Sequence, residues 1–217
     1  MSGVLRRAGA AVARYVAAGP WTVGYLVVLL AVHVWMGVVD PSAFVTWAST
    51  NVANLGTHPI GALVASLLIV NGSLLDPGTL ITLWLGIGGA LWWIESRHGP
   101  VRAAVVFLGG HVGGTLVTVP VILAAVRAGR YPAETRTAVD VGISYGAQAA
   151  LAAVVVALPG WARVPWVLFV YGWPLLDADW SGLLPDFTTV GHLVAATIGF
   201  VLAATWLRCA CERMWSP

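Results

Sequence analysis

Ser144 is the residue whose sequence surroundings most resemble those of a catalytic nucleophile. It lies in Gly142-Ile143-Ser144-Tyr145-Gly146, which fits the G-x-S-x-G pattern of the nucleophile elbow. That elbow joins a strand to a helix, whereas this pentapeptide opens a long apolar helical segment in a sequence without alternating strand patterns. A soluble hydrolase is therefore excluded. Taken alone, Ser144 is better explained by packing, because Gly142, Gly146 and Ala150 form a row of small residues.

His192 changes this interpretation of Ser144. A histidine inside a membrane-spanning segment is energetically expensive and indicates, by default, a functional site that faces the protein interior. Ser144 follows Asp140 by ~6 Å of helix rise, and His192 follows Asp186 by ~9 Å. Both side chains are therefore expected at a similar depth below the outer surface. There the imidazole can take the hydroxyl proton and make the serine a nucleophile, while Asp140 is interpreted as a favourable charge at a helix N-terminus.

The composition indicates that a lipid bilayer surrounds these residues. Of the 217 residues, 59% are hydrophobic and 9% are charged, against ~45–50% and ~25% in soluble domains. The net charge of +2 comes from scattered arginines, which argues against a nucleic-acid partner. The five histidines lack a metal-ligand spacing, and Cys209 and Cys211 are too few for a zinc site, so we expect no metal and no cofactor.

Six apolar runs have about the length that a membrane-spanning helix needs. They are 22–40, 77–95, 101–127, 141–159, 163–177 and 187–208. The stretch 59–70 is short for a crossing, and whether it crosses stays open. If it does not cross and the N-terminus is cytoplasmic, 8 of the 11 basic residues lie inside; if it crosses, 6 do. The positive-inside rule thus favours an all-α protein of six spans and one domain, residues 1–217, with 41–75 as a partly embedded outer loop.

The order of these spans and their motifs resembles the rhomboid intramembrane proteases over roughly residues 20–208. Family members carry G-x-S-G on the fourth span and H-x-x-G-x-x-x-G on the sixth. The matching positions here are Gly142, Ser144, His192, Ala195 and Gly199. The segment 95–99 (Glu-Ser-Arg-His-Gly) is similar to the family's E-x-x-x-G turn. The resemblance implies a six-helix rhomboid-like bundle in which Ser144 is the nucleophile, His192 is the general base, and a transmembrane helix is cut near its outer end.

The chain also departs from the family pattern. Tyr145 stands where the family has glycine, and Gln148 stands where it has an aromatic residue. The stretch 79–83 holds neither the histidine nor the asparagine that donate hydrogen bonds to the oxyanion, and each such donor is worth ~10²–10³ in rate. Gln148, or the backbone around Gly142 and Tyr145, is a candidate replacement. For His111, on the third span, a polar packing contact is favoured over a catalytic role by about two to one.

Two functions follow from this pattern. The first is a Ser-His intramembrane protease; the second is an inactive rhomboid-like protein that binds transmembrane clients, which the missing oxyanion donors favour. A small transporter is least supported, because the spans lack interior paired charges and a repeat. The expected partners are the lipid bilayer and a transmembrane substrate or client. The lysine-free, arginine-containing sequence suggests a bacterial inner membrane.

Overall fold

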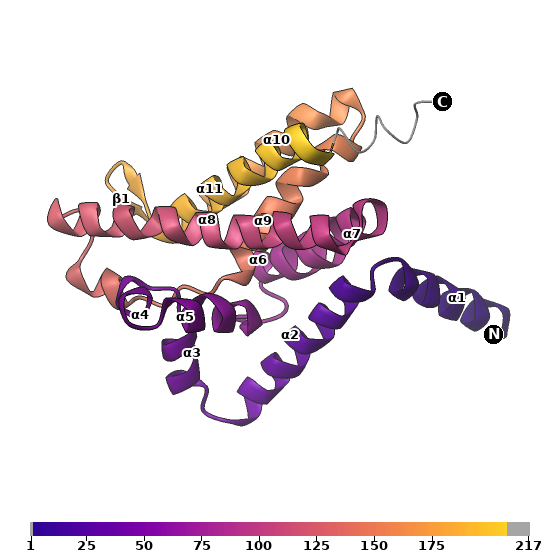
Figure 1. Ribbon diagram of the computed structural model, residues 1–217, viewed down its shortest axis with the longest axis horizontal. Helices are drawn as coiled ribbons and strands as arrows, with labels where there is room; N and C mark the ends of the chain where they lie inside the picture. The colour runs from indigo at the N-terminus through magenta and orange to yellow at the C-terminus, as the bar shows by residue number, and fades with distance from the viewer. Residues whose placement is uncertain (1, 208–217) are drawn as a thin grey trace.

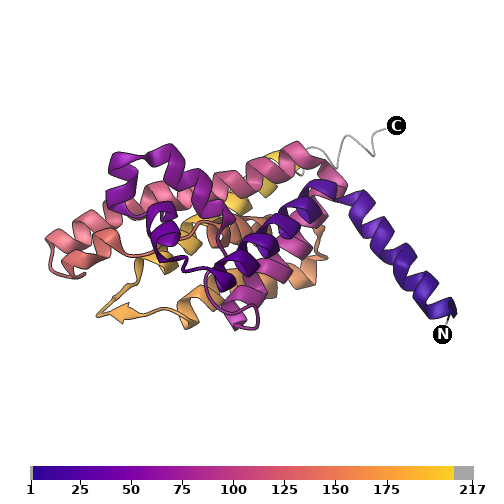
Figure 2. The ribbon, with the colours of Figure 1, turned by 90° about the horizontal axis from the view of Figure 1, so that it is seen from below.

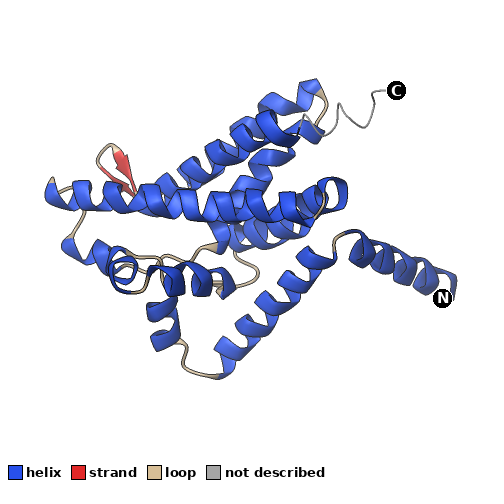
Figure 3. Ribbon diagram, viewed as in Figure 1, coloured by secondary structure: helices blue, strands red, loops and turns tan. Residues whose placement is uncertain are grey.

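The computed structural model describes residues 2–207, so Arg208, Cys209 and Cys211 lie outside it. Within residues 2–207, all regular secondary structure is helical apart from a short hairpin of β1 (Trp180–Ser181) and β2 (Leu184–Pro185) (Figure 3). In chain order, the helices are α1 (Ser2–Ala18), α2 (Pro20–Val38), α3 (Ser42–Ala48), α4 (Val52–Thr57), α5 (Pro59–Ala65), the 3₁₀-helix η1 (Ser66–Leu68), α6 (Pro77–Leu80), the π-helix η2 (Ile81–Leu91), α7 (Trp92–His98), α8 (Pro100–Arg127), η3 (Ala133–Thr137), α9 (Ile143–Ala153), η4 (Val154–Ala157), α10 (Gly160–Leu176), α11 (Phe187–Leu202) and the π-helix η5 (Ala203–Leu207).

Within residues 2–207, four helical stretches are long and apolar enough to cross a membrane: Pro20–Val38, Pro77–His98, Pro100–Arg127 and Phe187–Leu207. Ile143–Ala157 and Pro59–Leu68 are shorter apolar helices. At its helical rise per residue, Pro59–Leu68 is roughly 17 Å long, well short of the ~30 Å hydrocarbon core of a bilayer. Helices therefore lie at each of the six expected segments, but only four of these helical stretches meet both the length and the hydropathy of a span.

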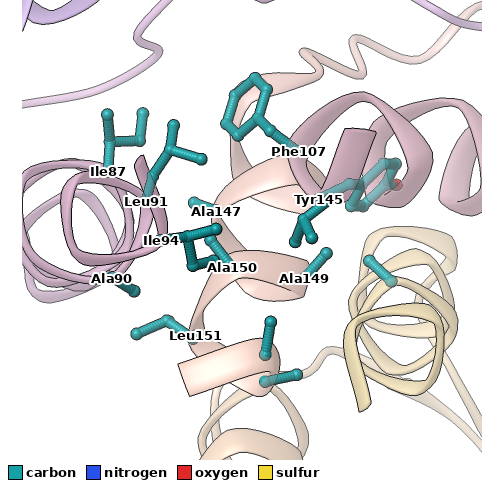
Figure 4. Close-up of a cluster of buried hydrophobic side chains, with 14 of the residues drawn as sticks. Ile87, Ala90, Leu91, Ile94, Phe107, Tyr145, Ala147, Ala149, Ala150 and Leu151 are labelled. Carbon is teal, nitrogen blue, oxygen red and sulfur yellow. The ribbon is translucent and has the colours of Figure 1, made fainter. Parts of the chain in front are cut away.

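Helix α9 lies at the centre of the bundle because small residues let its neighbours approach its backbone. A Cβ placed on Gly86 of η2 would lie 2.7 Å from Cβ of Ala147, and one on Gly110 of α8 would lie 2.3 Å from Cβ of Ala149. Close contact of this kind drives helix association in lipid, where the hydrophobic effect is absent between spans. Figure 4 shows α9 carrying alanines toward the larger apolar side chains of the second span and α8.

The turn between α7 and α8 also fastens the start of α2. The buried Glu95 carboxylate accepts the backbone N–H groups of Trp21 at 2.9 Å and Thr22 at 2.7 Å, which satisfies donors that the first turn of α2 cannot pair internally. Gly99 ends α7 with φ of +85°, a conformation that favours glycine, and its N–H bonds to the Glu95 carbonyl at 2.8 Å. The spacing of Glu95 and Gly99 therefore places the acceptor for α2 and the glycine that ends α7 in the same turn.

The segment between α2 and α6 folds back onto the opposite end of the bundle (Figure 1). The N–H of Thr50 donates to the Asp140 carbonyl at 2.8 Å, and the N–H of Asp140 donates to Oγ of Ser49 at 2.8 Å. His111 of α8 bonds the Leu63 carbonyl at 2.9 Å through Nε2. These bonds hold the segment against the connection that leads into α9.

Candidate functional site

Ser144 and His192 line one cavity of ≈ 320 Å³ at the end of the bundle where α9 and α11 begin. The second span and the chain before it form the facing wall. The other polar residues that line the cavity are Asn71, Asp76, Thr79, Thr82, Asp140, Asp177 and Thr188. A cavity with this polar lining suits a peptide bond and a water molecule better than a lipid chain.

Ser144 is the second residue of α9 and is partly exposed in the cavity. Gly142 precedes the helix, and a Cβ there would lie 2.0 Å from Cε1 of His111. Glycine at this position therefore lets the His111 ring pack directly beneath the start of α9. The first N–H groups of any helix lack intrahelical acceptors, and Gly142 offers no side-chain cap to satisfy them. These donors are consequently available next to the Ser144 hydroxyl.

His192 lies in the second turn of α11, a helix whose N-terminus is capped by Asp186. The Asp186 carboxylate accepts the N–H groups of Thr188 at 2.9 Å and Thr189 at 3.0 Å. Burial opposes ionisation of Asp186, but hydrogen bonds from these threonines outweigh it and hold its pKa below the ordinary value. The cap fixes where α11 starts, and thereby how deep His192 lies.

Two aromatic rings lie close to the His192 ring. Tyr145 packs edge-on against it with 5.2 Å between centroids, and Trp173 of α10 lies 5.9 Å away. Within residues 2–207, Nε2 of His192 is buried and has no hydrogen-bond partner, so no bond to Ser144 is formed through this atom. The imidazole thus has a nitrogen without a partner among the described residues, and the Ser144 side chain lines the same cavity.

Tyr145 connects His192 to a buried carboxyl group. Its hydroxyl donates to Oδ2 of Asp140 at 3.2 Å, and a Cβ on Gly191 would lie 2.3 Å from Cζ of its ring. Glycine at position 191 thus provides the space that the ring fills. Asp140 lies before α9, and burial raises its pKa to about 7 because the charged form loses its water, although the Tyr145 hydrogen bond opposes this rise. Asp140 therefore changes charge near neutral pH.

Gln148 and His111 lie outside the cavity lining. The Gln148 amide donates to the Val170 carbonyl at 2.5 Å and accepts from Nε1 of Trp173 at 3.2 Å, which ties α9 to α10 and holds Trp173 beside His192. His111 is buried behind the start of α9 and bonded to the loop at Leu63. The structure thus brings Ser144, His192 and Tyr145 together and puts Gln148 and His111 in supporting positions.

Thr79 and Thr82 are site residues that the sequence reasoning did not single out. Both line the cavity from the second span, in the stretch where the family carries its oxyanion donors. Residues three apart share one helix face, so their spacing already placed two hydroxyls together. Among the described residues, no group of three or more His, Cys, Asp or Glu side chains is arranged to hold a metal ion.

Comparison with known proteins identifies the family. A family model described as rhomboid-like protein matches residues 14–208. The chain belongs to the rhomboid-like family. The membership of the rhomboid family that the motifs indicated is therefore confirmed, and this rhomboid-like protein is an integral membrane protein in a lipid bilayer. No curated protein and no solved structure gives a significant match to it.

Proposed function

We propose that this rhomboid-like protein is an intramembrane serine endopeptidase that cuts a transmembrane helix near its outer end. Ser144 is the nucleophile and His192 the general base. The observation that carries the proposal is that both side chains line one polar cavity, with Nε2 of His192 unpartnered among the described residues. Two such groups at adjoining helix starts form a dyad that needs no third carboxylate.

The reaction begins when the Ser144 oxygen attacks the carbonyl carbon of the scissile peptide bond and the hydroxyl proton passes to His192. As the C–N bond breaks, His192 gives this proton to the leaving nitrogen, and an ester joins the substrate to Ser144. Water then gives a proton to His192 and attacks the ester carbonyl. The proton returns to the serine oxygen, and the new carboxyl end is released.

Two kinds of donor are available for the carbonyl oxygen while it carries negative charge. The unpaired N–H groups of the first turn of α9 are next to Ser144, and their helix dipole favours an anion. Thr79 and Thr82, whose hydroxyls can donate, line the same cavity from the second span. The family's histidine and asparagine are absent from this stretch. We therefore expect catalysis to be slower, by ~10²-fold or more, than in a site that has both of these donors.

The proposed orientation follows from the arginines. The N-terminus is cytoplasmic, the six helical segments cross the membrane, and 41–75 is an outer loop over the site. Arg97 and Arg102 adjoin the α7–α8 turn, at the bundle end where α2 starts. The membrane is a bacterial inner membrane. Cysteine accessibility in an Arg97→Cys variant tests the orientation. Protection from an impermeant reagent added outside supports a cytoplasmic α7–α8 turn, and labelling from outside contradicts it.

A client-binding protein without catalysis is the second candidate. Residues 79–83 contain no histidine or asparagine, and no hydrogen bond reaches Nε2 of His192 within residues 2–207. In this case the same cavity would hold the unwound end of a client helix without cutting it.

A fluorophosphonate probe on the purified protein separates the two candidates. The peptidase predicts labelling at Ser144 that is lost in Ser144→Ala and in His192→Ala. Ser96→Ala is the matched control, because Ser96 bonds the Trp93 carbonyl at the far end of the second span. Correctly folded protein that is not labelled in detergent or in liposomes indicates a non-catalytic binder.

A further inference from the structure

Helix α1 (Ser2–Ala18) extends away from the bundle (Figure 2). From Gly3 to Ala18, every side chain except that of Tyr15 is exposed. The contacts are made near its end: the Tyr15 hydroxyl donates to the Gly88 carbonyl at 2.5 Å, and its ring stacks on Trp92 at 4.6 Å. The family match begins at residue 14, so most of α1 lies outside it.

The sequence of α1 separates an apolar face from a basic one. At 100° per residue, the valine and leucine side chains of α1 fall in an arc of about 120°. They are Val4, Leu5, Val12 and Val16, exposed by 73%, 66%, 62% and 41%. Arg6, Arg7 and Arg14 lie on the opposite side, and residues 2–18 contain no acidic residue.

The attachment of α1 places it at the membrane surface. Gly19 joins it to α2, a stretch long and apolar enough to span the membrane. Glu95 holds the first turn of α2 beside the α7–α8 turn, and Trp21 lies in that first turn, where interfacial aromatic residues are enriched. A helix tethered there by one residue has water on one side and lipid headgroups on the other.

We infer that α1 is an interfacial helix that binds anionic lipid headgroups. Its valines and Leu5 enter the boundary between headgroups and acyl chains, and its arginines contact the negative headgroups. An exposed apolar face is unfavourable in water, and three arginines without a neighbouring acid complement an anionic surface. This role is independent of the proposed peptidase activity, because α1 contributes no residue to the cavity around Ser144.

The full-length protein tests this inference in vesicles of phosphatidylcholine, with and without phosphatidylglycerol. Single spin labels are placed at Val12→Cys, on the apolar face, and at Ala10→Cys, on the basic face, after Cys209 and Cys211 are replaced by serine. In anionic vesicles, the label at 12 should be more accessible to oxygen than to a nickel chelate, and the label at 10 should show the reverse. Amide hydrogen exchange over residues 2–18 should slow on the order of 100-fold when phosphatidylglycerol is added, because each of the three arginines contributes a factor of about five.

Changing Arg6, Arg7 and Arg14 together to glutamine should abolish this lipid dependence. The matched control changes Arg127, Arg130 and Arg136, which are also three exposed arginines but lie at the last residue of α8 and in the segment that follows it. Equal water exposure at positions 10 and 12 in anionic vesicles would overturn the inference. The inference would also be overturned if amide protection of residues 2–18 depended neither on lipid charge nor on the arginine substitutions. Spin–spin broadening at position 12 that grows with protein density would overturn it as well, because it would indicate pairing of two copies.

Discussion

Replacing Gly199 by alanine should force α11 away from α9. A Cβ at this position would lie 2.2 Å from the backbone oxygen of Ala149 and 2.9 Å from its carbonyl carbon. Real Cβ atoms essentially never approach another atom this closely, so the two helices must separate by about 1 Å. Because the obstacle is backbone rather than side chain, no change of rotamer relieves it.

The separation has an energetic and a functional consequence. Overpacking of a well-packed helix contact costs about 1–3 kcal/mol, and we expect the upper part of this range because backbone must move. His192 lies two turns from Gly199 on the same helix, ~10 Å away. A displacement of ~1 Å between reacting groups lowers rates by ~10²-fold. Fluorophosphonate labelling of Ser144 should therefore slow by about that factor, even where the protein still folds.

Gly113→Ala is the matched control for this prediction. A Cβ on Gly113 would lie 2.3 Å from Cδ1 of Ile198, almost as close, but that atom ends a flexible side chain that can rotate away. Its expected cost is below about 1 kcal/mol. Thermal unfolding in detergent and the labelling rate measure both variants. If Gly199→Ala proves as stable and as reactive as Gly113→Ala, the close backbone contact between α9 and α11 is refuted.

Three further predictions concern groups around the site. Glu95→Ala leaves two N–H groups of α2 without acceptors and should lower the free energy of unfolding by about 1–3 kcal/mol. Glu95→Gln keeps one acceptor and should lower it less. Equal losses of stability for the two variants in thermal unfolding would contradict the role of Glu95 as the cap of α2. His111→Leu removes the bond to Leu63 and should speed amide exchange over residues 59–68, while unchanged exchange would show that the bond does not hold the loop. Burial raises the pKa of Asp140 from 3.8 to about 7, so the folded protein keeps a proton that the unfolded chain releases. The free energy of unfolding should therefore fall by roughly 1.4 kcal/mol per pH unit between about pH 5 and pH 7; an Asp140→Asn protein with the same slope in denaturant titrations would refute this.

Part of this architecture is predictable from the sequence because it depends on local patterns. Helices are present at all six segments that the long apolar runs, separated by proline and glycine residues, predicted. These segments could be predicted because a membrane span needs only length and hydropathy. The glycine and alanine rows on α9 and α11 predicted close approach of these helices, which the contact at Gly199 shows.

Other features depend on contacts between distant residues, which no local pattern contains. The bond from Gln148 to α10 and the position of Trp173 beside His192 arise only when α9, α10 and α11 assemble. Helix α1 was missed for a different reason. Arg6, Arg7 and Arg14 interrupt its apolar residues, so residues 2–18 do not have the uninterrupted apolar pattern of a membrane-spanning helix.

The departures from the family pattern at positions 145 and 148 compensate each other around His192. Position 148 no longer supplies an aromatic ring, but Gln148 accepts a hydrogen bond from Trp173 and so holds a ring from α10 beside the imidazole. Position 145 holds a tyrosine in place of the family's glycine, and its ring packs edge-on against the imidazole. Its bulk is accommodated because position 191 is glycine. Two aromatic rings thus lie beside the imidazole, although neither ring comes from the position that the family uses.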